Sequence, residues 1–317
     1  MKELAEMAEK FVVVAGSPRS GTSLLRTFLT RSAALCVHKT EPHYVIDLYQ
    51  RHGRTITDVK GAADFLLSHE KFPAAEVGEA ELRKALEGRT SISLSELLRT
   101  CYRLLNREHP ERPVVLKHPG FILHLDLIKD LFPGVFVIHS IRDPRANAHS
   151  QRTRWPSTSL WDAASRWRSS VRAGREWQAR RATPYLEIRY EDLVTEPDAT
   201  CATICGFLGI PFDQAMLAFD HVEREWNPAN PGEGAKRHYQ GFEKQRIHKW
   251  KKYMAPAEVK LIEDRCRDGM ALFDYELMNP QVDVSAYVPY YLKERKKALK
   301  KSVKRMRKRL RLRVGAS

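Results

Sequence analysis

Short apolar runs alternate with stretches of helical periodicity over most of the chain. Apolar residues at helical spacing follow the first two runs, and an Asp-Pro pair that can open a helix follows the third. Strands that alternate with helices indicate an α/β fold with a mostly parallel sheet covered on both faces. Such a sheet binds ligands at the carboxyl ends of its strands. The predicted strands are residues 11–15, 114–116, 135–138 and 185–188.

Two parts of the chain depart from this alternation. Residues 44–110 are polar and mostly helical in pattern, without a strong strand, and we interpret them as an insertion over the sheet that sets substrate specificity. Residues 293–317 are a basic tail. The remaining residues, 1–292 including the insertion, are expected to form one domain.

The tail accounts for most of the charge of the chain. It holds thirteen Lys or Arg residues and one acid, Glu294, and contributes +12 of the formal net charge of +15. Because the body carries only +3, nucleic-acid binding by the main domain is not indicated. Apolar residues at helical spacing predict a cationic amphipathic helix, suited to an anionic membrane surface, a polyanion or the body of the protein. These apolar residues are Leu292, Leu299, Val303, Met306 and Leu310.

The sequence offers no sign of export. No apolar run reaches the ~18–20 residues that span a bilayer, and the N-terminus lacks the apolar segment of a signal peptide. The five cysteines are scattered, and Cys201 and Cys205 are expected to be buried thiols rather than zinc ligands. We therefore expect a cytoplasmic protein without a metal site, which the tail could attach peripherally to a membrane.

A candidate phosphate loop, GSPRSGTS at residues 16–23, joins the first predicted strand to the first predicted helix. In such a loop, backbone N–H groups and the helix N-terminus face an anion. Ser20, Thr22 and Ser23 add hydroxyl donors, and Arg19 adds a fixed cation. The spacing matches a Walker A loop, except that Thr22 stands where a nucleotide kinase needs a lysine, which argues against ATP chemistry.

A second candidate phosphate site follows the third predicted strand. Asp143 is a good N-cap and Pro144 suits the first helical position. Arg142 precedes this helix, whereas Ser150 and Arg154 share one of its faces because they are four residues apart. Two arginines and a hydroxyl are good phosphate ligands, and the alternative is a solvated basic helix start.

Together these segments resemble the sulfotransferase family. GSPRSGTSLLR resembles the 5′-phosphosulfate loop, closest to the tyrosylprotein and carbohydrate type, and RDPRANAHS at 142–150 resembles the 3′-phosphate site. Tyr190, in YEDL, resembles the tyrosine at the adenine end; a core aromatic is the alternative. The resemblance implies a P-loop-like parallel sheet flanked by helices. It further implies a metal-independent, in-line transfer of a sulfuryl group from 3′-phosphoadenosine 5′-phosphosulfate (PAPS) to an acceptor hydroxyl, releasing 3′,5′-ADP (PAP). The implied nucleotide-binding residues are Arg19, Ser20, Gly21, Thr22, Ser23, Arg142, Ser150, Arg154, Tyr190 and Arg246.

The resemblance also suggests the catalytic residues. Lys117, at the end of the second predicted strand, resembles the family lysine that reaches the sulfate and the bridging oxygen, and Arg19 is a second cation. Glu41 stands where tyrosylprotein-type and many bacterial members carry a catalytic glutamate. His118 is the alternative base, although it lies one residue too early for the Lys-x-His pattern of cytosolic members. His43 is interpreted as a polar loop residue.

Several choices stay open at this point. The family places basic residues in a late loop over the nucleotide, and Lys236, Arg237, Lys244 and Arg246 all precede Trp250. The acceptor could be a small molecule, a glycan or a lipid. The alternative functions are a P-loop nucleotide kinase and a catalytically inactive sulfotransferase-like binding protein.

Overall fold

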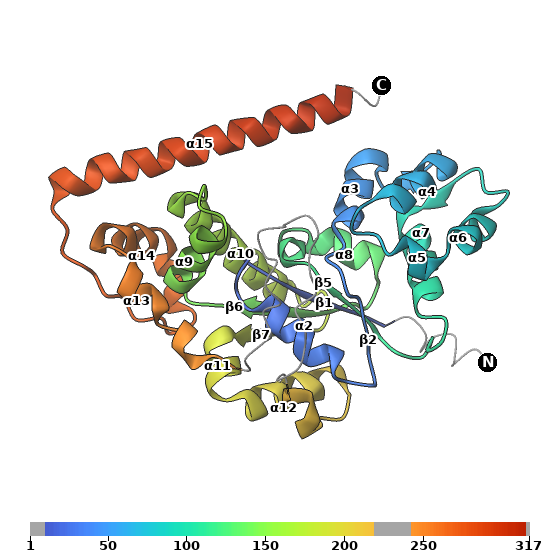
Figure 1. Cartoon of the computed structure of the whole chain (residues 1–317), viewed down its shortest axis with the longest axis horizontal. Coiled ribbons are helices and arrows are strands. Elements are labelled where there is room, and N and C mark those ends of the chain that lie inside the picture. The colour runs from blue at the N-terminus through green and yellow to red at the C-terminus, as the bar shows by residue number, and fades with distance from the viewer. Residues whose placement is uncertain (1–9, 219–241, 315–317) are drawn as a thin grey trace.

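A computed structural model of the chain, which describes residues 10–218 and 242–314, has a five-stranded parallel sheet at its centre (Figure 1). The strand order is β2-β5-β1-β6-β7, and β1 pairs with β5 on one side and β6 on the other. The four predicted strands are confirmed. The edge strand β2 was missed because two residues are too short for a pattern. The strands are β1 (Phe11–Gly16), β2 (Cys36–Val37), β5 (Val114–Lys117), β6 (Phe136–Ile141) and β7 (Tyr185–Arg189).

Alternate residues of β1 enter different apolar cores, because successive side chains of a strand point to opposite faces. Phe11 and Val13 join the core under α3 (His43–His52), α4 (Val59–Ser68), α7 (Leu94–Leu105) and α8 (Leu125–Leu131). Val12 and Val14 join the core under the helices of the opposite face. Every residue of β1 is buried, as expected for a strand in a sheet covered on both faces. The helices of the second face are α2 (Thr22–Thr30), α11 (Tyr190–Thr195) and α12 (Pro197–Leu208).

The segment from His43 to Leu105 is mostly helical and lies at one end of the molecule (Figure 1). It contains one pair of antiparallel two-residue strands, β3 (Thr55–Ile56) and β4 (Ile92–Ser93). The helices are α3 (His43–His52), α4 (Val59–Ser68), α5 (Ala74–Val77), α6 (Glu79–Leu86) and α7 (Leu94–Leu105); the 3-10 helix η1 (Pro119–Leu123) and α8 (Leu125–Leu131) follow β5.

A third apolar core lies beyond the end of β6, around Trp167 and Trp250, which are both 1% exposed. Trp167 reaches back to the sheet, where its indole Nε1 donates to the carbonyl of Arg142 at 2.7 Å. The elements that form this core are α9 (Pro144–Arg154), α10 (Leu160–Arg180), α13 (Lys249–Tyr253) and α14 (Pro256–Ala271). Two 3-10 helices complete the body, η2 (Gln214–Leu217) and η4 (Lys244–Arg246).

The chain ends in the long helix α15 (Val284–Val314), which runs along one edge of the molecule (Figure 1). The helix begins nine residues before the tail defined from sequence. Glu294 fastens it to the body, since its carboxylate accepts from the N–H of Leu160 at 2.7 Å and its carbonyl accepts from the hydroxyl of Ser159 at 3.0 Å. The buried Glu294 carboxylate thus lies at the positive end of α10. Among the described helices, none is long and apolar enough to cross a membrane.

Candidate active site

The loop between β1 and α2 has the backbone conformation that an anion-binding turn needs. Arg19 and Gly21 both have positive φ, at 72° and 101°. A Cβ atom on Gly21 would lie 2.6 Å from Cδ2 of Tyr190, so this position requires glycine for both its conformation and its packing. Left-handed backbone at a non-glycine residue costs free energy and is concentrated at functional sites. Thr22 begins α2, so the loop ends at a helix N-terminus.

Asn147, on α9, joins the two sequence motifs. Its Nδ2 donates to the carbonyl of Pro18 at 2.9 Å and to the hydroxyl of Ser20 at 3.0 Å. Its Oδ1 accepts from Nε2 of Gln151 at 2.6 Å. Ser140 adds a second tie, a 2.7 Å hydrogen bond from its hydroxyl to the carbonyl of Ser20. Sequence reasoning missed both residues. Asn147 occupies an unspecified position of the 142–150 motif, and only its polarity in a helix that becomes buried could have marked it.

Arg142 lies where the nucleotide motifs meet. Its guanidinium donates to the carbonyls of Arg246 at 2.9 Å and Arg19 at 3.2 Å, and it stacks 4.2 Å over the ring of Tyr190. Its buried Nε has no hydrogen-bond partner within the described part of the chain. Arg19 in turn donates to the hydroxyl of Ser150 at 3.2 Å. The structure therefore brings these five residues into one cluster, although they span more than 200 positions of sequence.

The remaining nucleotide candidates are near this cluster or outside the described residues. Arg154 is the last residue of α9, about one turn beyond Ser150. Lys244 and Arg246 are exposed in η4, and only Arg246 is shown to meet the cluster, through its carbonyl. Lys236 and Arg237 lie outside the residues that the structure describes.

Buried acids that sequence reasoning missed hold the start of α9. Glu191 accepts from the N–H of Asp143 at 3.1 Å and from the hydroxyl of Tyr275 at 2.7 Å. Arg145 pairs with Asp143 at 2.7 Å and with Glu263 at 2.6 Å. Burial raises the pKa of Glu191. Glu191 and Glu263 are 48 and 118 residues away from their partners Asp143 and Arg145, so no local pattern could have found these acids.

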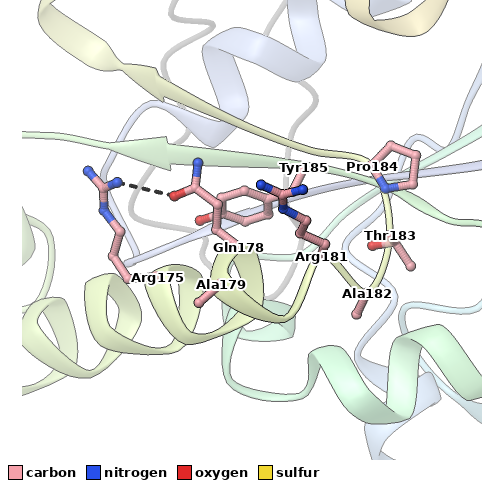
Figure 2. A pocket seen from close by; sticks show the side chains of 8 residues that line it. All are labelled: Arg175, Gln178, Ala179, Arg181, Ala182, Thr183, Pro184 and Tyr185. Atoms are coloured by element: carbon pink, nitrogen blue, oxygen red, sulfur yellow. Dashed lines mark hydrogen bonds between the residues drawn. The ribbon is translucent and has the colours of Figure 1, made fainter.

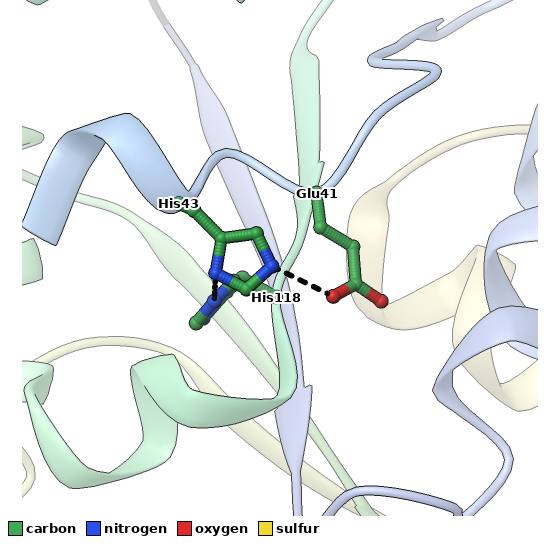
Figure 3. Close-up of side chains that lie close together, drawn as sticks. All are labelled: Glu41, His43 and His118. Atoms are coloured by element: carbon green, nitrogen blue, oxygen red, sulfur yellow. Dashed lines mark hydrogen bonds and ion pairs between the residues drawn. The ribbon is translucent and has the colours of Figure 1, made fainter. Parts of the chain in front are cut away.

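The candidate catalytic residues meet at the carboxyl end of β5. Lys117 is only 3% exposed, and its ammonium group pairs with Oε1 of Glu41 and lies 3.4 Å from the hydroxyl of Ser23 in the phosphate loop. Oε2 of Glu41 lies 3.4 Å from Nε2 of His43. Nδ1 of His43 lies 3.0 Å from Nε2 of His118 (Figure 3). His43, interpreted from sequence as a loop residue, is instead the first residue of α3 and links both candidate bases.

The surroundings set the charges of these groups. Burial alone would raise the pKa of Glu41, but the hydrogen bond from His43 and the charge of Lys117 outweigh it, and the pKa lies well below its usual range. Burial, followed by the neighbouring His43, lowers the pKa of His118 to about 3. At neutral pH the site therefore holds a carboxylate and a neutral imidazole, the unprotonated forms that a general base requires.

A surface pocket elsewhere on the molecule is not part of this site (Figure 2). It lies between the C-terminal end of α10 and the start of β7, where Arg175 donates to Gln178 at 3.1 Å. Because β7 runs parallel to the other strands, its start belongs to the amino edge of the sheet. The phosphate loop and Lys117 follow the carboxyl ends of β1 and β5, at the opposite edge. The lining residues are Arg175, Gln178, Ala179, Arg181, Ala182, Thr183, Pro184 and Tyr185.

Comparison with known proteins gives a family match over most of the sheet. Residues 12–214 match the model described as the sulfotransferase family. Protein-tyrosine sulfotransferase 1 of Danio rerio is similar over 222 residues at 24% identity. That match covers 67% of this chain and 56% of the relative, so the chain spans little more than half of the relative's length.

Two solved structures share the fold. The sulfotransferase domain of the Synechococcus PCC 7002 olefin synthase superposes with a TM-score of 0.59 at 24% identity, covering 84% of this chain and 95% of that domain. The sulfotransferase domain from the curacin biosynthetic pathway gives a TM-score of 0.61 at 19% identity, covering 85% of this chain and 99% of that domain. The predicted fold, a parallel sheet flanked by helices, is thereby confirmed.

Proposed function

The chain belongs to the sulfotransferase family, and we propose that it transfers a sulfuryl group from PAPS to an acceptor hydroxyl and releases PAP. The observation that carries this proposal is the position of Lys117. Its ammonium group lies between Ser23 of the phosphate loop and Glu41, so one buried cation touches both the anion-binding loop and a candidate base. Such a cation is placed to stabilise charge that develops between donor and acceptor.

In this mechanism the loop 16–23 and the start of α2 hold the 5′-phosphosulfate. Arg142, Ser150 and Arg154 hold the 3′-phosphate, and Tyr190 lies at the adenine end. The unpartnered Nε of Arg142 supports an anion there, because a buried donor without a partner is costly until a ligand supplies one. Arg246 contributes through its carbonyl, which positions Arg142.

The transfer itself needs a base beside the acceptor hydroxyl and positive charge beside the leaving oxygen. Glu41 accepts the proton of the acceptor hydroxyl while the oxygen of that hydroxyl forms a bond to sulfur. The bond from sulfur to the bridging oxygen breaks, and PAP leaves with that electron pair. Lys117 and Arg19 stabilise the charge on the bridging oxygen. No step in this scheme uses a metal ion.

The ion pair between Lys117 and Glu41 implies that donor binding prepares the base. While Lys117 pairs with Glu41, the carboxylate is a weak proton acceptor, since its pKa is well below the usual range. When the sulfuryl group of PAPS draws the ammonium toward the bridging oxygen, Glu41 loses that charge partner and its basicity rises. The acceptor therefore meets an active base only after the donor is bound.

A thermal-shift comparison tests the nucleotide assignment. PAP at 100 times its dissociation constant should stabilise the protein by ~2.7 kcal/mol. AMP, which lacks the 3′-phosphate, should need a far higher concentration for the same shift. A nucleotide kinase would instead respond to ATP with magnesium and not to PAP, which would contradict the proposal. Formation of a sulfated product from PAPS then separates an enzyme from an inactive binding protein.

We further propose that α15 brings the enzyme to an anionic membrane surface. Of the predicted stripe, Leu292 and Leu299 are exposed and Val303 is half-buried, whereas the side chains of Met306 and Leu310 lie outside the residues that the structure describes. An exposed apolar stripe among basic residues is the pattern of a helix that lies in a membrane interface. Each basic residue near such a surface contributes ~1 kcal/mol, and salt weakens this attraction.

Truncation after Ala298 tests the role of the tail without removing the contacts of Glu294. The shortened protein loses nine basic residues and should no longer sediment with phosphatidylserine vesicles. Its turnover on a water-soluble acceptor should be unchanged. Vesicles of phosphatidylcholine alone are the control for non-specific binding. Vesicle binding that survives the truncation, or a collapse of turnover, would contradict the proposal.

A further inference from the structure

Glu41, His43 and His118 form a set of possible metal ligands at the carboxyl edge of the sheet (Figure 3). One donor atom from each side chain lies within 4.8 Å of the others. The three come from the loop before α3, from the first residue of α3 and from the residue after β5. Within residues 10–218 and 242–314, no other group of His, Cys, Asp and Glu side chains meets this criterion.

The spacing of the donor atoms suits a transition-metal ion. Zinc bonds of 2.0–2.1 Å in a tetrahedron place neighbouring ligand atoms roughly 3.3 Å apart. Nδ1 of His43 and Nε2 of His118 are 3.0 Å apart, and their rings meet edge to face with centroids 4.5 Å apart. An ion between these nitrogens would replace the hydrogen bond that now joins them. Oε2 of Glu41 now lies beside Nε2, the other ring nitrogen of His43, so the partly exposed side chains of Glu41 and His43 must shift for Oε2 to become the third ligand.

The two oxygens of Glu41 have different neighbours, which lets a metal bind beside Lys117. Oε1 pairs with Lys117, whereas Oε2 faces His43. Oε2, the oxygen that is not paired with Lys117, is therefore the one that Glu41 would offer to an ion. The ammonium of Lys117 also repels a cation, so the site favours ions that gain most from imidazole nitrogen. Two imidazoles and one carboxylate match zinc, whereas magnesium and calcium prefer oxygen ligands.

Two of the ligand side chains are accessible, and the third is held by packing. The side chains of His43 and Glu41 are 46% and 34% exposed, so an ion can reach them from solvent. The ring of His118 packs on Phe121, with centroids 4.7 Å apart, and against Gly120, where a Cβ atom would lie 2.9 Å from Cε1. Ligands held in place by packing lose less freedom when an ion binds.

We infer that Zn²⁺ binds to Glu41, His43 and His118 and that the bound ion inhibits sulfuryl transfer. The inhibition rests on the proposed function, because it follows from Glu41 being the base. A carboxylate that donates its lone pair to zinc cannot accept the proton of the acceptor hydroxyl. The ion also occupies the space in front of Glu41 that the acceptor must enter. Zinc binding itself does not depend on the proposed reaction.

The first experiment measures binding of zinc to the full-length, tag-free and metal-stripped protein. Calorimetry, supported by competition with a chromophoric chelator, should find one zinc ion per chain. His43→Ala and His118→Ala should each weaken zinc binding by more than ~10-fold, since loss of a second-shell partner already costs that much. His109→Ala is the matched control, because the His109 side chain is similarly exposed and also pairs with a glutamate, Glu111. A thermal shift with PAP verifies that each variant is folded.

The second experiment measures turnover at buffered zinc concentrations. In the wild type, the zinc concentration that halves turnover should equal the dissociation constant for zinc. In His43→Ala, this concentration should rise by the same factor as the dissociation constant. Magnesium at equal concentration should not inhibit. Absence of zinc binding, or equal binding by wild type and His43→Ala, would overturn the site. Binding at the site without inhibition would overturn the inhibitory role. If the protein binds zinc as expected but, once stripped of metal, does not transfer a sulfuryl group, the zinc site is supported and the proposed function is overturned.

Discussion

Replacing Glu41 with glutamine is expected to lower turnover by ~100-fold or more while leaving the affinity for PAP nearly unchanged. Glutamine keeps the size of the side chain and an oxygen for Lys117 but cannot take the acceptor proton. The link between Glu41 and the phosphate loop runs through Lys117, from which glutamine can still accept a hydrogen bond, so the nucleotide should bind as before. Initial rates with PAPS and calorimetry with PAP measure the two quantities.

The matched control is His118→Ala, which removes the competing base. If Glu41 is the base, this variant should retain much more turnover than Glu41→Gln. Abolished turnover in His118→Ala, together with an active Glu41→Gln, would reverse the roles. The comparison is direct because both side chains touch His43 and lie at the same edge of the sheet.

The pH profile gives a second check of Glu41. Because hydrogen bonds and Lys117 hold its pKa well below the usual range in the free enzyme, Glu41 stays ionised there at all but strongly acidic pH. Protonation of Glu41 should therefore not reduce kcat/KM for PAPS between about pH 8 and pH 5. Once Lys117 turns to the donor, the pKa of Glu41 should rise. The acid limb of kcat should then lie at higher pH than that of kcat/KM.

Replacing Arg142 with alanine is expected to weaken PAP binding by ~10-fold or more while leaving AMP binding nearly unchanged. A hydrogen bond to a charged group contributes ~1.5–3 kcal/mol, and only PAP offers the 3′-phosphate. Arg152→Ala is the matched control, because Arg152 lies on the helix that follows Arg142 and pairs with Glu258. Equal losses for PAP and AMP would show that Arg142 only supports the loop through the carbonyls of Arg19 and Arg246.

The central sheet could be predicted because parallel strands buried on both faces appear as short apolar runs. The phosphate loop could be predicted because its backbone turn constrains several consecutive residues. The start of α9 could be predicted because Asp143 caps the helix and Pro144 begins it. β2 has only two residues, and its pairing with β5 depends on chain that folds elsewhere, so no local pattern marked it.

The contacts that position the site could not be predicted, since they join distant parts of the chain. Glu191 and Tyr275 are 84 residues apart, and Arg145 and Glu263 are 118 apart. An isolated acid in a helical pattern is typical of a solvated surface, and only the folded structure shows that these acids are buried. The role of His43 likewise could not be predicted, because only the folded chain places this residue between Glu41 and His118.

Asn147 gives the nucleotide site a fixed span. One amide joins the loop after β1 to the helix after β6, so the separation between the two anion-binding motifs is set before any ligand arrives. The two motifs together would then select a ligand by the distance between two of its phosphate groups. A nucleotide with all its phosphates at the 5′ end would occupy only one of the two motifs, however many phosphates it carries. We therefore expect ATP to compete weakly, because discrimination would come from the spacing of charges rather than from their number.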